Sequence, residues 1–97
     1  MQFEWDPRKD RANRAKHGLS FEEASRLFIE SLNVLEVYDE GHSQDEDRFI
    51  AIGPIDRGVI VVSFAERPDD LIRIFSARMA TPKERRQYES YWRGRDE

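Results

Sequence analysis

Residues 59–64, Val-Ile-Val-Val-Ser-Phe, form the most apolar stretch of the chain and predict a central β-strand. Residues 34–37 and 48–53 precede this stretch with strand-like patterns, and residues 71–77 follow it with another. Short segments rich in glycine, proline and aspartate separate the four strands. Because connections this short favour hairpins over crossovers, we expect an antiparallel meander.

Two helices are predicted before these strands. Asp6-Pro7 is typical of an N-cap followed by proline at the first helical position, and Gly18 is typical of a C-terminal stop, so a short polar surface helix is expected between them. Ser20, with glutamate three residues later, forms a capping box. The apolar residues that follow at helical spacing predict an amphipathic helix; they are Phe21, Ala24, Phe28 and Leu32.

A third helix is predicted near the end of the chain. Thr81 and Glu84 form a second capping box, with Pro82 at the first helical position. The predicted fold class is therefore α+β, with two N-terminal helices, an antiparallel sheet of about four strands and a C-terminal helix. The length of 97 residues favours a single domain over residues 1–97.

Composition excludes several classes of protein. The chain lacks cysteine, which excludes a disulfide scaffold, a zinc–thiolate site and a thiol nucleophile. Its mean hydropathy is −0.82, but its aromatic residues (six Phe, three Tyr and two Trp) argue against disorder. No apolar run approaches the roughly 18 residues of a membrane span, and the N-terminal segment lacks the pattern of a signal peptide, so a cytoplasmic location is expected.

The net charge of −4 is unevenly distributed along the chain. Residues 33–70 hold ten acidic and three basic side chains, whereas residues 71–97 hold seven basic and four acidic ones. Because charges act over about one Debye length, roughly 10 Å, a basic surface on an acidic protein can still bind phosphate.

Three arginines surround the last predicted strand. Arg67 lies in the turn before it, Arg73 lies within it, and Arg78 follows it. Strict alternation would place Ser76 with the isoleucines on one face, and Ala77 with Arg73 on the other. The planar guanidinium forks could converge on a phosphate, and ion pairs with the acidic middle of the chain are the alternative.

The two histidines differ in their surroundings. His17 ends the first predicted helix, where it either complements the helix dipole or acts as a general acid or base. His42 lies in the acidic segment 39–47 and is expected to be solvated. The spacing in this segment matches neither a calcium loop nor a histidine zinc motif, so neither a metal site nor another cofactor is expected.

The last predicted helix carries both aromatic and basic side chains. Tyr88, Tyr91 and Trp92 form a stripe of a kind that is usually part of a core. Arg85 belongs to a ladder of surface pairs, and Arg86 lies on a basic face that could follow a nucleic-acid backbone.

The order and spacing of these motifs resemble those of the BrnT toxins, which belong to BrnT/BrnA type II toxin–antitoxin systems. The matching segments, over nearly the whole chain, are Phe3–Pro7, Asn13–Gly18, Ser20–Ala24, Arg48–Gly53, Arg67, Arg73–Arg78, Ala80, and Glu84 with Arg85 and Tyr88. The resemblance implies a RelE-like fold and an RNA-cleaving growth inhibitor. It also implies a ribbon-helix-helix antitoxin of the BrnA type, a heterotetramer that represses its own operon, and contact with operator DNA through the antitoxin.

The resemblance, carried over by position, also implies an active site. Its expected members are Lys16, His17, Arg67, Arg73, Arg78, Glu84 and Tyr88, with Arg48, Arg85 and Arg86 as further RNA contacts. In metal-free cleavage a base takes the 2′-hydroxyl proton, cations stabilise the phosphorane and an acid protonates the leaving 5′-oxygen. We expect Arg67, Arg73 and Arg78 to stabilise the negative charge of the transition state. Lys16 would hold a phosphate, and His17 would act as base or acid.

Glu84 is an alternative base and Tyr88 an alternative acid.

Two other functions stay open at this point. One is a catalytically silent module that binds RNA or a partner, and the other is a structural subunit of a DNA-binding repressor complex.

Overall fold

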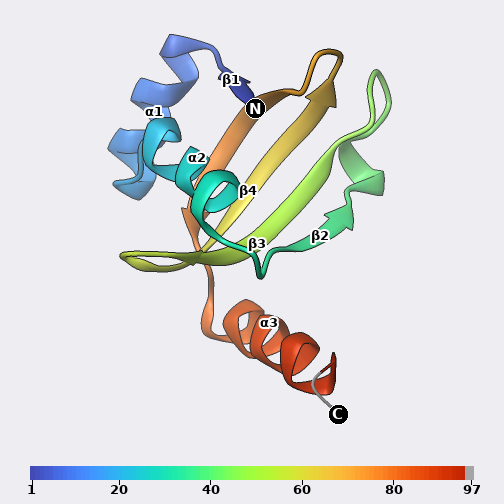
Figure 1. Cartoon of the computed structure of the whole chain (residues 1–97). Coiled ribbons are helices and arrows are strands. Elements are labelled where there is room, and N and C mark those ends of the chain that lie inside the picture. Colours follow the sequence, from blue (N-terminus) through green and yellow to red (C-terminus); the bar gives the residue numbers. More distant parts are fainter. Residues whose placement is uncertain (96–97) are drawn as a thin grey trace.

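The structure is a computed structural model that describes residues 1–95, and these residues form an α+β fold around one mixed sheet (Figure 1). The strands lie in the order β1-β5-β4-β3-β2, with β1 parallel to β5 and the other neighbours antiparallel. The elements are β1 (Gln2–Glu4), α1 (Pro7–His17), α2 (Phe21–Glu30), β2 (Leu35–Tyr38), the 3₁₀-helix η1 (Glu40–His42), β3 (Phe49–Ile55), β4 (Gly58–Arg67), β5 (Leu71–Met79) and α3 (Pro82–Arg95). No helix within residues 1–95 is long and apolar enough to cross a membrane.

The predicted starts of the first two helices and the predicted end of the first are confirmed by their backbone geometry and hydrogen bonds. The Asp6 carboxylate accepts from the backbone N–H of Arg8 at 2.9 Å, and Gly18 ends α1 in the left-handed region with φ of +69°. The Ser20 hydroxyl accepts from the N–H of Glu23 at 3.0 Å at the start of α2. Leu32 was expected on the buried stripe, but it lies beyond the end of α2 and is 97% exposed; the fully buried leucine of this helix is Leu27.

The four predicted strands are confirmed, but the expectation of an all-antiparallel sheet of four is wrong. A fifth strand, β1, pairs in parallel with β5, with Gln2 opposite Leu71. Three residues are too few for a periodic pattern, and a partner 69 positions later cannot be seen in local sequence. β3 also continues through Pro54, which the sequence places in a turn, as far as Ile55.

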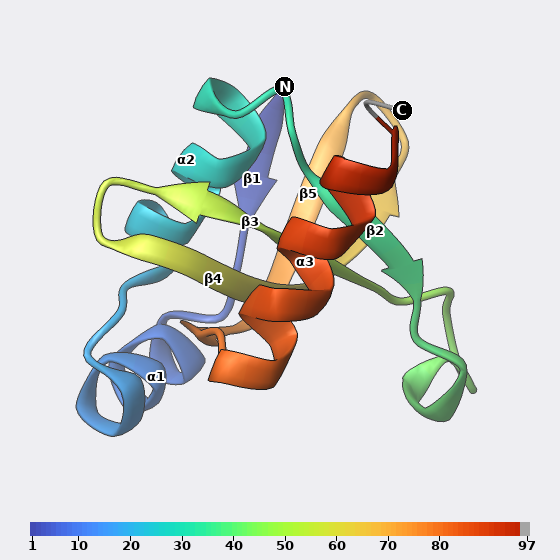
Figure 2. The same ribbon diagram turned by 90° about the horizontal axis from the view of Figure 1, so that it is seen from below.

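The sheet has a different partner on each face. Phe21, Ala24 and Leu27 of α2 pack on one face against the main core, whose fully buried strand residues include Phe64 and Val62. On the other face α3 packs through Tyr88 and Trp92 against apolar residues of β3 and β4. Figure 2, seen from below, shows α3 lying across the strands, with α1 and α2 to one side.

A β-bulge in β5 overturns the predicted alternation of its side chains. Ser63 lies opposite Ser76, but the next residue, Phe64, lies opposite Ile74, so Phe75 is an extra residue. The extra residue reverses the faces that follow, and Ala77 is fully buried in the main core with Ile74. Arg78 consequently lies on the face that α3 covers, where strict alternation would have put Ala77.

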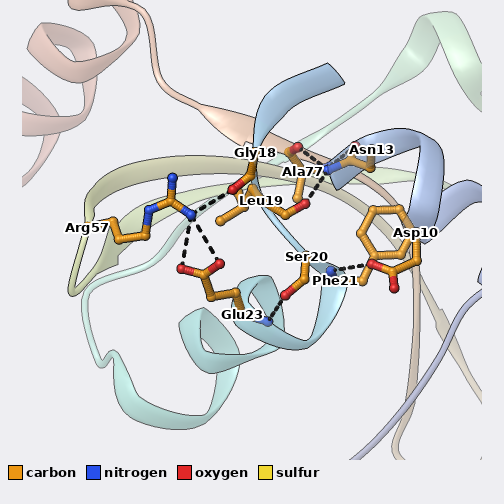
Figure 3. Close-up of polar contacts among 9 residues, drawn as sticks. All are labelled: Asp10, Asn13, Gly18, Leu19, Ser20, Phe21, Glu23, Arg57 and Ala77. Carbon is orange, nitrogen blue, oxygen red and sulfur yellow. Dashed lines mark hydrogen bonds and ion pairs between the residues drawn. The ribbon is translucent and has the colours of Figure 1, made fainter. Parts of the chain in front are cut away.

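Asn13 of α1 holds the helix against β5 beyond the bulge (Figure 3). Within α1 it is the one buried residue, at 8% exposure. Its amide donates to the carbonyl oxygens of Leu19 and Ala77 at 2.8 and 2.7 Å, and its oxygen accepts from the N–H of Ala77 at 3.2 Å. Strand β1 pairs with β5 from Leu71 to Arg73. Further along β5, at Ala77, the Asn13 side chain forms the hydrogen bonds that a neighbouring strand would otherwise form.

Polar contacts also hold the loop between α1 and α2 in place (Figure 3). The Asp10 carboxylate accepts from the N–H of Phe21 at 2.8 Å. Arg57, in the turn between β3 and β4, donates to the Gly18 carbonyl at 2.8 Å and pairs with Glu23 at 3.1 Å. These contacts fix the end of α1, where Lys16 and His17 lie.

Candidate functional site

A cavity of about 350 Å³ opens on the face of the sheet that α3 covers. Ile50 of β3 and Val61 of β4 line this cavity and also pack in the cluster around Tyr88, so the cavity adjoins α3. Its polar and charged lining comes from α1, the segment 39–48 around η1, β4 and β5; these residues are Lys9, Asp39, His42, Arg48, Ser63, Ser76 and Arg78.

A second hollow of about 240 Å³ lies beside α1 and contains Lys16 and His17. It shares Lys9, Phe75 and Ser76 with the first cavity. The two hollows therefore adjoin along the bulge of β5, and together we call them the bulge groove.

Two cations lie against the ring of Phe75 in the bulge groove. The guanidinium carbon of Arg48 lies 3.8 Å from the ring centroid, and Nζ of Lys9 lies 5.8 Å from it. Both distances fall within the range of cation–π attraction. The ring thus fixes the two cations at the bulge, where both line the first cavity.

Arg78 is oriented by Glu84 at the start of α3. Its two terminal nitrogens donate to the two carboxylate oxygens at 2.7 and 2.8 Å, a bidentate pair. The hydrogen bonds from Arg78 lower the pKa of Glu84 from its ordinary 4.5 to about 2, with the Thr81 N–H contributing at 2.9 Å. Glu84 is thus ionised and engaged at neutral pH, an arrangement that suits holding Arg78 better than accepting a substrate proton.

Arg67 and Arg73 lie away from Arg78. Oε1 of Glu4, on the unpredicted strand β1, is 3.6 Å from Nε of Arg67 and 3.6 Å from Nη1 of Arg73. Arg67 also pairs with Glu46 at 3.1 Å. At about 3.3 Å per strand residue, the five steps along β5 from Arg73 to Arg78 span roughly 16 Å. The three arginines therefore do not converge, and each of them forms an ion pair with a carboxylate: Arg67 and Arg73 with Glu4, and Arg78 with Glu84.

The remaining predicted residues of α3 are dispersed. Tyr88 is buried at 8% exposure, its hydroxyl donates to the Asn33 carbonyl at 2.5 Å, and burial raises its pKa. Arg85 and Arg86 are exposed on α3. Tyr88 therefore contributes to packing between α3 and the sheet.

The structure thus places four predicted residues along the bulge groove: Arg48 and Arg78 line the first cavity, and Lys16 and His17 line the second hollow. Sequence reasoning missed Lys9 and the pair of Asp39 and His42 in the same groove. The one signal for the pair is an aspartate three positions before a histidine in a loop, which is too common a pattern to single out. Within residues 1–95, no three histidine, aspartate or glutamate side chains are grouped so that they could hold a metal ion.

Comparisons with known proteins agree with each other. The sequence model of a family described as the ribonuclease toxin, BrnT, of type II toxin–antitoxin systems matches residues 5–84. Among solved structures, the chain is similar to the 1.1 Å crystal structure of the Brucella abortus ribonuclease toxin BrnT, with 30% sequence identity and a TM-score of 0.65. That similarity covers 84% of this chain and 97% of the Brucella chain. No curated protein matches the chain.

Proposed function

This chain belongs to the BrnT family of ribonuclease toxins of type II toxin–antitoxin systems, and from that premise we propose that it cleaves RNA in the bulge groove without a metal ion. The observation that carries the proposal is the set of cations that line the groove. Arg78 is held by both oxygens of Glu84, Arg48 lies on Phe75, and Lys9 lines both hollows.

The groove chemistry suits the cleavage of a phosphodiester by its own 2′-hydroxyl. The transition state is a phosphorane with extra negative charge, and fixed cations stabilise it more than they stabilise the substrate. We assign Arg78 and Arg48 to that charge and Lys16 to a substrate phosphate, and the family resemblance makes His17 one candidate for proton transfer. DNA lacks the 2′-hydroxyl and is not expected to be cut.

The other predicted residues receive different roles in this proposal. Arg67, Arg73, Arg85 and Arg86 contact the RNA backbone outside the groove. Glu84 positions Arg78, and Tyr88 supports α3.

We further propose the cellular setting that the family resemblance implies. The whole chain acts as one RelE-like toxin domain in the cytoplasm. A ribbon-helix-helix antitoxin of the BrnA type neutralises it in a heterotetramer, and that complex represses its own operon, with operator DNA bound by the antitoxin. The support is the family, whose description names a type II toxin–antitoxin system.

The test is an RNA-cleavage assay on the purified chain, with and without ribosomes and with a chelator of divalent metals present. We expect single-stranded RNA to be cut and DNA of the same sequence to stay intact. Arg78→Ala should lower the rate about 100- to 1,000-fold, the usual cost of removing one such donor. Arg11→Ala, an exposed change on α1, is the matched control and keeps the parent rate.

Three results would contradict the proposal. Full activity in Arg78→Ala would remove the groove from the mechanism, and loss of cleavage on chelation would contradict metal independence. RNA binding without products would favour the silent binding module instead.

A further inference from the structure

Asp39 and His42 form a close pair at the bulge groove. Nδ1 of His42 lies 2.9 Å from Oδ2 of Asp39. The Asp39 side chain is 15% exposed and the His42 side chain 74%, so a largely enclosed carboxylate holds an imidazole that solvent and substrate can reach. Both residues line the same cavity as Arg48 and Arg78.

The segment that carries the pair is bonded to the start of β3. The N–H of Asp39 donates to the Arg48 carbonyl at 2.8 Å. The Ser43 hydroxyl donates to the Asp39 carbonyl at 2.6 Å and accepts from the N–H of Arg48 at 3.0 Å. The imidazole therefore has a fixed backbone relation to Arg48, whose guanidinium rests on Phe75.

An imidazole held in this way can transfer a proton. Histidine changes charge between pH 5 and 8, and a carboxylate at Nδ1 selects the tautomer that leaves Nε2 able to accept. A phosphate between Arg48 and Arg78 would lie in the cavity that His42 also lines. These are the parts that cleavage of single-stranded RNA requires: fixed cations and a base.

We propose that His42, positioned by Asp39, is the general base of RNA cleavage in the bulge groove. The assignment rests on the proposed ribonuclease function. The 2′-oxygen forms a bond to phosphorus while its proton passes to Nε2 of His42, and the bond between phosphorus and the 5′-oxygen breaks. The leaving oxygen takes a proton from water, and the imidazolium returns its proton to the hydroxide. The products are a 2′,3′-cyclic phosphate and a 5′-hydroxyl.

Charged groups surround His42 from several elements. Lys9 of α1, Arg48 just before β3 and Arg78 of β5 line the same cavity as the pair, and Asp39 contacts Nδ1 directly. Replacing the Asp39 carboxylate therefore tests whether it positions the imidazole for the reaction.

The experiment measures single-turnover cleavage and binding of a 5′-labelled single-stranded RNA. We expect His42→Asn to cut at least about 100-fold more slowly, to lose the rising limb near neutral pH and to bind RNA like the parent. Asp39→Asn should slow cleavage while RNA binding stays like that of the parent, and Asp39→Glu, which keeps the carboxylate, should restore part of the rate. Glu40→Gln, an exposed change in the same segment, is the control and keeps the parent rate.

His17→Asn is measured beside these variants because it carries the competing assignment. Under the proposal it retains the rising limb of the profile. Parent-like cleavage by His42→Asn, or loss of the limb in His17→Asn alone, would overturn the role of His42 while leaving the ribonuclease function intact. A parent chain that cuts no RNA would overturn both.

Discussion

Replacing Asn13 by alanine should destabilise the fold strongly, because it removes three hydrogen bonds from a buried position. Two carbonyl oxygens, of Leu19 and Ala77, lose their donor, and the N–H of Ala77 loses its acceptor. At a net value of about 1 kcal/mol each, the loss is about 3 kcal/mol, and more if the orphaned groups stay dry. For a domain of this size that is a fall in Tm of roughly 12–24 °C.

Urea unfolding followed by circular dichroism gives the free energy of unfolding for the parent and each variant. Arg11→Ala, which truncates an exposed side chain two positions earlier on α1, is the control and should stay within about 0.5 kcal/mol of the parent. A loss in Asn13→Ala below about 1 kcal/mol, or one equal to that of Arg11→Ala, would refute the idea that this side chain replaces a strand partner on β5.

Three further predictions concern α3 and the contact between α2 and β3. Because the pKa of Glu84 is lowered to about 2 in the fold, its contribution to stability is complete above about pH 4.5 and is lost as the pH falls toward 2. The free energy of unfolding of Glu84→Gln should therefore decline less steeply between pH 4.5 and 2 than that of the parent. Gly53→Ala would place a Cβ 2.6 Å from Cδ1 of the buried Leu27 and should lower the free energy of unfolding by about 1–3 kcal/mol. Gly94→Ala is the control and should not lower it, because no atom lies within 4 Å of the added Cβ. Equal free energies of unfolding for the two variants in urea would contradict this reasoning. Tyr88→Phe should cost about 1 kcal/mol and keep RNA cleavage, and a large loss of rate at unchanged RNA affinity would restore Tyr88 as an acid.

The helices and four of the strands were predictable because their signals are local. The caps at Asp6 and Ser20 and the glycine stop at Gly18 act within one turn of helix, and the structure confirms them. The apolar run at residues 59–64 lies in a strand with neighbours on both sides, as its composition predicts.

The parts that sequence missed depend on contacts between distant residues. β1 is a strand because β5 is beside it, and the role of Asn13 depends on Ala77, 64 positions away. The bulge at Phe75 adds a single residue, and no pattern within β5 marks it. That one residue moved Arg78 to the groove and Ala77 to the core.

The candidate site was only partly predictable, because it too depends on contacts between distant residues. Positive charge in the last quarter of the chain singled out Arg78, which lines the bulge groove, but the partners of each arginine are set by the fold. Glu4 on β1 holds Arg67 and Arg73, and Glu84 holds Arg78. His42 is exposed, as the sequence predicts, but its place beside the groove arises only when η1 and β5 are brought together.

The contact between Asn13 and Ala77 also has a consequence for the order in which the chain folds. The β3–β4 and β4–β5 hairpins close short loops, whereas the bonds between Asn13 and Ala77 and the β1–β5 pairing must close loops of more than sixty residues, at a higher entropic cost. We expect the hairpins to form first and the N-terminal strand and helix to dock after the rate-limiting step. In stopped-flow experiments, Asn13→Ala should then accelerate unfolding and leave the folding rate almost unchanged.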